Sequence, residues 1–229
     1  MTLQEGAASQ KTRVSIVKAL LIVGMAIDAI AILSGFAQQS LLTRAASGLA
    51  VTEAEAAAND ARHGLIGMIQ MLVFFATAIC WLVWMHRAYS NLRLMGTTET
   101  NYSPGWSVGY WFVPIMSLFR PYQLTKELWL RSARSNAQQP TAEIAPPTIL
   151  SLWWGVWIVS GLFGRALMRW SFRAEAIDEL QAVTVAGIGL DAVGIVSAVL
   201  AFVVASNIDV LQRRAASILT DLSHEPTTP

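Results

Sequence analysis

The sequence has very little cysteine and little charge. Cys80 is the single cysteine among 229 residues, so an intrachain disulfide is impossible and a disulfide-stapled fold is excluded. Charged residues make up 14% of the chain, against about 25% in soluble globular proteins. The 16 lysines and arginines nearly balance the 15 aspartates and glutamates, so no net field attracts nucleic acid. Disorder, nucleic-acid binding and an ordinary cytosolic enzyme are therefore excluded as classes.

Familiar catalytic signatures are missing as well. The sequence has no Walker phosphate-binding loop, no HExxH zinc motif, no nucleophile elbow and no Cys/His set with metal-ligand spacing. His63 and His86 flank one apolar run and are expected at opposite membrane faces, where they cannot share a metal. We therefore expect no metal, no cofactor and no enzymatic activity.

Long apolar runs are what the sequence does contain. Hydrophobic residues make up 54% of the chain, and a membrane-spanning helix needs about 20 mostly apolar residues. Four runs are long enough, at about residues 19–37, 64–86, 148–164 and 183–206. We expect an all-α polytopic membrane protein, a single membrane domain over residues 1–229, with four transmembrane helices in two hairpins. Flexible tails are expected at residues 1–12 and 223–229.

The first run also has features of a cleavable signal peptide. Lys11, Arg13 and Lys18 precede it, and small residues near Ala37 suit a cleavage site. However, Asp28 lies in the middle of the run, and the run is long for a signal peptide. We expect this segment to be retained as the first span.

A fifth apolar stretch, from Trp106 to Phe119, is shorter than the others. Fourteen residues of helix are about 21 Å long, whereas the hydrocarbon core is about 30 Å thick. Pro114 removes a backbone donor and would kink a helix. We expect a proline-broken segment over about residues 104–122 that is embedded in the membrane or lies at its interface. A helix that continued to Leu130 would span, but it would carry charged residues into the membrane.

The positive residues favour the arrangement with four spans. In that arrangement both termini lie on one side with eleven lysines and arginines, and the other side has five. A spanning middle segment would give eight on each side. Because positive residues gather in cytoplasmic loops, we expect both termini to be cytoplasmic.

A distinctive motif follows the second apolar run. It begins with Arg-Ala-x-x-Asn-Leu, continues with a Pro-Gly-Trp turn and a Trp-Phe-Val-Pro stretch, and ends with Arg-Pro-Tyr. This pattern resembles that of an uncharacterised bacterial membrane family, domain of unknown function 4328. The matching residues are Arg87, Ala88, Asn91, Leu92, Trp106, Trp111, Phe112, Pro114, Arg120, Pro121 and Tyr122. Ser117 and Phe119 depart from the pattern, since Asn and Trp are frequent there. The resemblance implies a shared fold in a bacterial plasma membrane, and it implies no reaction.

The motif provides the first candidate site. Arg87 and Asn91 are four residues apart and share a helix face, and an arginine fork suits a phosphate or a carboxylate. In one interpretation Arg87 and Arg120 clamp an anionic headgroup or ligand beneath Trp106 and Trp111. In the other, the arginines are positive-inside anchors and the tryptophans form an aromatic belt. The candidate binding residues are Arg87, Asn91, Trp106, Trp111, Pro114, Arg120, Pro121 and Tyr122.

Two acids provide the second candidate site. Asp28 and Asp191 lie near the middle of the first and fourth spans, and carboxylates inside a membrane commonly have a function. They are interpreted either as a proton-linked or cation-binding pair, or as neutral groups that lock helix packing. Our leading hypothesis is a non-enzymatic protein that binds membrane lipids or a membrane partner, including a second copy, through the central motif. The alternative is a small transporter or channel that uses Asp28 and Asp191.

Overall fold

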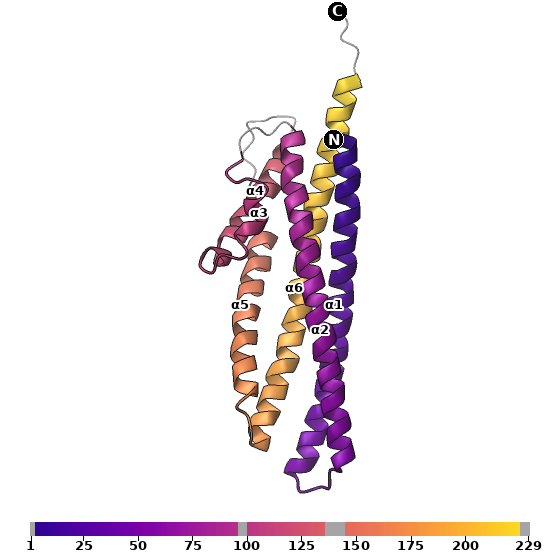
Figure 1. Ribbon diagram of the computed structural model, residues 1–229, viewed down its shortest axis with the longest axis vertical. Helices are drawn as coiled ribbons and strands as arrows, with labels where there is room; N and C mark the ends of the chain where they lie inside the picture. Colours follow the sequence, from indigo (N-terminus) through magenta and orange to yellow (C-terminus); the bar gives the residue numbers. More distant parts are fainter. Residues whose placement is uncertain (1–2, 96–99, 136–144, 225–229) are drawn as a thin grey trace, which may run out of the picture. The chain divides into compact units, whose positions relative to one another are not determined.

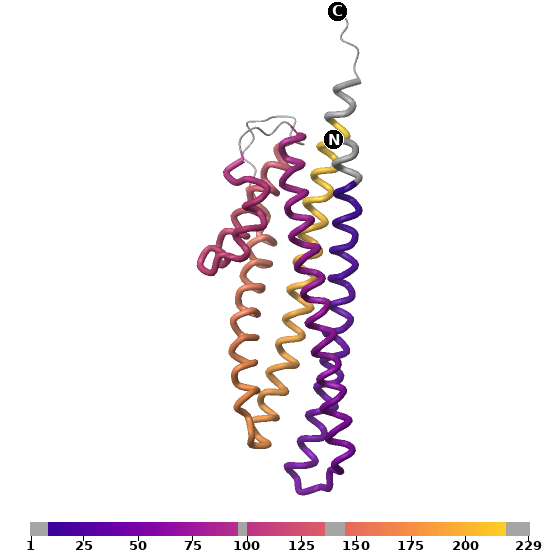
Figure 2. The backbone as a smooth tube through the Cα atoms, in the orientation of Figure 1, coloured from indigo at the N-terminus to yellow at the C-terminus, as the bar shows by residue number. Residues whose placement is uncertain are grey.

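Four long helices dominate the structure, which is a computed structural model that describes residues 3–95, 100–135 and 145–224. The elements are α1 (Leu3–Ala46), α2 (Glu53–Leu94), α3 (Trp106–Gly109), the 3-10 turn η1 (Met116–Leu118), α4 (Arg120–Arg134), α5 (Thr148–Ser171) and α6 (Ile177–His224) (Figures 1 and 2). The described residues contain no β-strand. The predicted all-α fold with four membrane-length helices is confirmed.

Helices α1, α2, α5 and α6 are each long and apolar enough to cross a membrane. The 42 residues of α2 extend for about 63 Å, roughly twice the hydrocarbon thickness, so this helix continues well beyond one bilayer core. Helix α1 begins at Leu3, so residues 3–12, expected as a tail, are helical. Of the other predicted tail, 223 and 224 end α6, while 1, 2 and 225–229 lie outside the described residues. The four helices indicate a multi-pass membrane protein.

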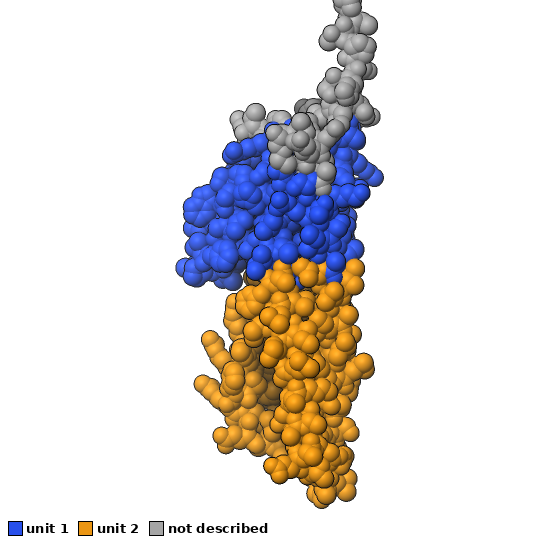
Figure 3. Space-filling view, turned by 45° about the vertical axis from the view of Figure 1, so that its right-hand side comes forward, with its two compact units in different colours: residues 1–19, 77–154, 200–229 blue, residues 20–76, 155–199 orange. Residues whose placement is uncertain are grey.

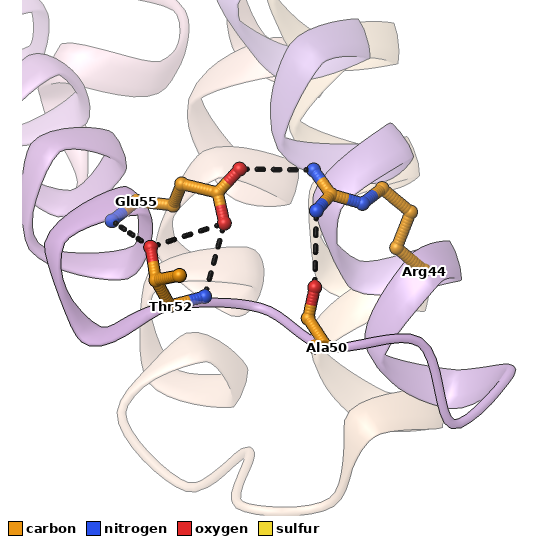
Figure 4. Close-up of polar contacts among 4 residues, drawn as sticks. All are labelled: Arg44, Ala50, Thr52 and Glu55. Atoms are coloured by element: carbon orange, nitrogen blue, oxygen red, sulfur yellow. Dashed lines mark hydrogen bonds and ion pairs between the residues drawn. The ribbon is translucent and has the colours of Figure 1, made fainter.

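The connection between α1 and α2 is closed by a compact set of polar contacts (Figure 4). The Thr52 backbone N–H donates to the Glu55 carboxylate at 2.9 Å, and the Glu55 N–H donates to the Thr52 hydroxyl at 3.2 Å. This reciprocal pair is a capping box, which satisfies the first N–H groups of a helix. Arg44 donates to Glu55 at 3.2 Å and to the Ala50 carbonyl at 3.0 Å. Gly48 turns the chain with a φ of +74°, which a residue with a Cβ rarely adopts.

The chain divides into two compact units, coloured separately in Figure 3. Unit 1 comprises residues 1–19, 77–154 and 200–229, and unit 2 comprises residues 20–76 and 155–199. Each of the four long helices contributes to both units. The fully buried large side chains of unit 1 include Val14, Val17, Trp84, Met85, Tyr89, Leu92, Leu124, Leu128, Leu150 and Ile208. Large exposed apolar side chains in unit 2 include Leu33, Met68, Leu72, Phe74 and Val159. Exposed apolar side chains on a membrane-spanning helix are suited to contact lipid chains.

Unit 1 contains a buried carboxylate on α4. Glu127 is 7% exposed, and it accepts hydrogen bonds from the Tyr89 hydroxyl and, at 2.7 Å, from the Asn101 backbone N–H. The Arg131 guanidinium lies 3.7 Å from the same carboxylate. A buried charge is tolerated when it is paired and hydrogen-bonded, so these contacts explain how α4 packs with an acid on its inner face.

Candidate functional site

The two intramembrane acids meet in unit 2 through a glutamine. The Gln70 side-chain amide donates to Asp28 Oδ1 at 2.9 Å and to Asp191 Oδ1 at 3.0 Å. Because both bonds start at one nitrogen, the two carboxylate oxygens are no further apart than the sum of these distances. Three helices therefore supply one polar group each: α1 supplies Asp28, α2 supplies Gln70 and α6 supplies Asp191. We call these three residues the acid cluster.

Helical periodicity explains why these groups face each other. On α2 the residues His63, Ile66, Gly67 and Gln70 follow the i, i+3, i+4, i+7 spacing of a single helix face. On α6 the same spacing joins Thr184, Gly187, Ile188 and Asp191. These eight residues all line one cavity of unit 2, together with residues of α1 and α5. Gln70 and Asp191 therefore lie on the inner faces of their helices, and the hydrogen bond from Gln70 holds Asp28 beside them.

The cavity has a volume of about 550 Å³, and the surface of unit 2 is visibly hollowed in Figure 3. Its lining is mostly apolar, and α5 contributes Leu167 and Met168 to it. Its polar side chains are those of Gln38, His63, Gln70, Ser171, Thr184 and Asp191. Small-molecule sites commonly have volumes of about 300–1,000 Å³, an apolar lining and a few polar groups that orient the ligand. The volume and the mostly apolar lining of this cavity are therefore those of a small-molecule site.

Two glycines allow α1 and α6 to approach closely in unit 2. A Cβ on Gly35 would lie 2.6 Å from Ile188 Cγ1, and a Cβ on Gly194 would lie 2.9 Å from Asp28 Oδ2. Both distances are shorter than any ordinary carbon contact, so a side chain at position 35 would displace Ile188 and one at position 194 would displace the Asp28 carboxylate. Gly194 therefore makes the space that the Asp28 carboxylate occupies.

We expect Gly194→Ala to destabilise the protein by about 1–3 kcal/mol, because the added methyl group pushes the Asp28 carboxylate away from Gln70. Thermal unfolding of the purified protein in detergent measures this effect. The matched control is Gly189→Ala on the same helix, where an added Cβ meets no atom within 4 Å. The control should be neutral or slightly stabilising, since alanine favours a helix over glycine. Equal unfolding temperatures for the two variants would contradict the close approach.

A second polar group joins α1 to α2 in unit 2. The Arg62 guanidinium donates to the Ser34 hydroxyl at 2.8 Å and to the Asn59 amide oxygen at 2.6 Å. His63 Nε2 lies 3.3 Å from the same hydroxyl. His63 also lines the cavity, seven residues before Gln70 and thus about 10 Å away along the helix. The cavity wall therefore carries one acid, Asp191, near the level of Gln70 and an imidazole, His63, at a different level.

The central motif lies in unit 1, where Arg120 contacts its own segment. Arg120 Nη1 donates to the Tyr102 hydroxyl at 2.7 Å and to the Gln123 amide oxygen at 2.9 Å. The guanidinium also lies 5.6 Å from the ring centroids of Tyr102 and Tyr110 and 5.8 Å from that of Phe119. Distances within about 6 Å are typical of cation–π contacts. Arg120 thus joins the turn before α3 to the first turn of α4.

The structure brings some of the other motif residues together and separates others. Trp106 stacks on Tyr110 with ring centroids 4.7 Å apart, so it shares a neighbour with Arg120. Trp111 instead packs edge-on against Trp154 at 5.9 Å. Of the Arg-Pro-Tyr end, Pro121 is buried in the first turn of α4, and the Tyr122 hydroxyl lies 3.0 Å from that of Ser151.

Three motif residues lie outside this cluster of rings. Pro114 is exposed in the turn between α3 and η1. Arg87 and Asn91 lie one turn apart on α2, as their spacing indicates, and Asn91 is 3% exposed. Asn91 also lines a small cavity in unit 1.

Gln70 is the residue that sequence reasoning missed. It lies in the second apolar run, which contains no Asp, Glu, Lys or Arg between Arg62 and Arg87. A search for charges therefore passes over it, although an amide inside a membrane also needs hydrogen-bond partners. Among the described residues, no three His, Cys, Asp or Glu side chains gather as a metal site requires.

Comparison with known proteins supports the motif assignment. No curated protein matches the chain, and no solved structure matches it. The family model described as "Domain of unknown function (DUF4328)" matches residues 47–209, which is more than half of the chain. This match includes the central motif and confirms the family that the motif predicted. The chain belongs to the DUF4328 family of domains of unknown function.

Proposed function

We propose that the protein is a small, non-enzymatic membrane transport protein that binds a cationic solute at Asp28 and Asp191. The observation that carries this proposal is the Gln70 amide, which donates to both carboxylates beside a cavity of about 550 Å³. Carboxylates in a membrane are costly, and they generally face a cavity and mark a path for ions or substrates. A bound cation or proton would neutralise the charge that the two acids share.

The cavity favours an organic cation over a metal ion. Its volume is far larger than one inorganic ion needs, and its lining is mostly apolar. A hard metal cation prefers about six to eight oxygen ligands, whereas the acid cluster offers two carboxylates and one amide. An ammonium group with an apolar body matches both ends of this site, because the acids pair with the charge and the lining packs against the body.

The positive residues suggest how the site is oriented. With both termini cytoplasmic, the connection between α1 and α2 faces outward, and His63 lies between that connection and Gln70 along α2. The proposed bacterial plasma membrane would then have His63 on the outer side of the acid cluster. Labelling of single cysteines in a Cys80→Ser background tests this, using Ser47 and Ser135 as positions. A membrane-impermeant thiol reagent applied to intact cells should label position 47 and leave position 135 unlabelled; the reverse pattern would contradict the orientation.

Flux measurements test the transport proposal. The full chain is reconstituted in lipid vesicles, and the movement of protons, potassium and ethidium is followed with a fluorescent indicator for each cation. We expect the protein to accelerate at least one of them over protein-free vesicles, and we expect Asp28→Asn to reduce this acceleration strongly. Rates equal to those of protein-free vesicles for all three cations would contradict the proposal. Acceleration of potassium alone would favour a channel for inorganic cations.

A second function, lipid binding by the central motif, is favoured by one specific observation. Phe112 and Ile115 flank Pro114 and are 71% and 74% exposed, so this segment presents large apolar side chains. We propose that it inserts among membrane lipids, with Arg120 holding its turns in shape. Phe112→Ser with Ile115→Ser should then reduce the lipid that copurifies with the protein, compared with Ser103→Ala in the same segment. Unchanged lipid content would contradict this second function.

A further inference from the structure

Unit 1 contains a second buried polar group, which neither proposed function uses. Gln10 on α1 is 1% exposed and Gln212 on α6 is 2% exposed. Both line a small cavity of about 10 Å³, together with Asn91 of α2 and Arg213. The remaining lining residues are the apolar Leu94, Met95 and Ala216. Two buried glutamines from distant parts of the chain therefore line the same cavity of unit 1.

The hydrogen bonds of these glutamines are incomplete. Gln212 Nε2 donates to the Ala88 carbonyl at 2.8 Å and lies 3.3 Å from the Ser132 hydroxyl, while its Oε1 is buried without a protein partner. Gln10 Oε1 and Nε2 are both buried without a protein partner. Burying amide groups without hydrogen bonds is costly, and nearly all buried polar groups in folded proteins are bonded. A third group between the two side chains would supply the bonds.

We propose that this cavity binds one ordered water molecule that bridges Gln10 and Gln212. A volume of about 10–15 Å³ is what a single water needs when it also has two to four polar partners, and the cavity meets both conditions. One water can donate to the two Oε1 atoms and accept from Gln10 Nε2. A cation cannot accept that hydrogen bond. The charge of Arg213 in the cavity wall is already paired with Asp209 at 3.0 Å.

This water has a defined structural role in unit 1. Gln212 already joins α6 to α2 through Ala88 and to α4 through Ser132. The bridge to Gln10 extends the network to α1, so a single hydrogen-bonded group holds four helices of unit 1. The water would thus give the Gln10 Oε1 and Nε2 atoms their hydrogen-bond partners and join α1 to the other three helices.

Nuclear magnetic resonance of the full chain in lipid nanodiscs tests the proposal, with the glutamine side-chain amides labelled with ¹⁵N. We expect the Gln10 amide to show a cross-relaxation peak with a water that stays bound for longer than bulk exchange allows. In Gln10→Met the long-lived water should be lost from the Gln212 amide as well, and the unfolding temperature should fall by several degrees. The matched control is Gln181→Met, because Gln181 is not buried and makes one bond of 3.4 Å. It should leave the unfolding temperature and the Gln10 peak unchanged.

Two results would overturn the proposal. The first is the absence of a bound-water peak at Gln10 in the wild-type protein. The second is an unfolding temperature that rises when sodium replaces choline, with the rise lost in Gln10→Met, because the site would then hold a cation. Both readouts are independent of transport, so they separate this inference from the function proposed for the acid cluster.

Discussion

Asp28→Asn and Asp191→Asn are each expected to reduce cation flux in vesicles by at least about tenfold, which corresponds to about 1.4 kcal/mol. The reason is electrostatic. An asparagine keeps the size of the side chain and can still accept from Gln70, but it removes one of the two negative charges that face the solute. In the low dielectric of a membrane interior, the attraction between a carboxylate and a cationic solute is stronger than the apolar contacts that the solute makes.

The matched control for this prediction is Asp178→Asn. Asp178 lies on α6 like Asp191, but it is exposed in the first turn of the helix and outside the acid cluster. It removes the same formal charge from the chain, so the flux should stay within about twofold of wild type. Equal losses in Asp178→Asn and Asp191→Asn would show that net charge matters and that the cluster has no special role. Undiminished flux in both cluster variants would remove the transport proposal.

Gln70→Met is expected to reduce flux by a similar factor and to lower the free energy of unfolding by about 3 kcal/mol, since two hydrogen bonds to acidic groups are lost. Methionine preserves the length and the apolar stem of glutamine, so the cavity keeps its shape. Without the amide the two carboxylates face each other with no donor between them, and at most one of them can be charged at low cost. Chemical denaturation in detergent measures the stability, and the vesicle assay measures the flux.

A double-mutant cycle shows whether Gln70 acts through Asp28. The variants are Gln70→Met, Asp28→Ala and the two combined, since alanine at position 28 leaves no acceptor for Gln70. Because both residues share one hydrogen bond of 2.9 Å, their effects on unfolding should be non-additive by about 1 kcal/mol or more. Additive effects would mean that the residues do not interact in the membrane, and the acid cluster would then be wrong as described.

The sequence predicts the number of long helices because each spanning helix requires a long apolar run. It predicts the helix ends poorly, because charged residues mark the edge of the hydrocarbon core, whereas the helix itself continues beyond that edge. Lys18 limits the first apolar run, yet α1 begins at Leu3. The two buried glutamines show why this happens, because Gln10 and Gln212 lie in helical extensions that pack in the core of unit 1.

The sequence indicates which polar residues lie in the candidate sites, but it does not indicate which of them come together. Asp28 and Asp191 stand out because a charge inside an apolar run is conspicuous, but a single sequence does not say which helix faces meet. That information depends on packing, here on the close approach of α1 and α6 at Gly35 and Gly194. The bonds from Arg120 to Tyr102 and Gln123 likewise depend on turns around a proline-rich segment, whose geometry residue spacing does not define.

The most direct test of the acid cluster is cross-linking of cysteines placed at positions 28 and 191. In a Cys80→Ser background, a short bifunctional thiol reagent is added to membranes that contain the full chain, and linked peptides are measured by mass spectrometry. The comparison pair joins position 28 to position 178, which is about 20 Å further along α6. The structure predicts rapid linkage of 28 to 191 and little linkage of 28 to 178. Equal rates for the two pairs, or no linkage of 28 to 191, would contradict the convergence of the acids.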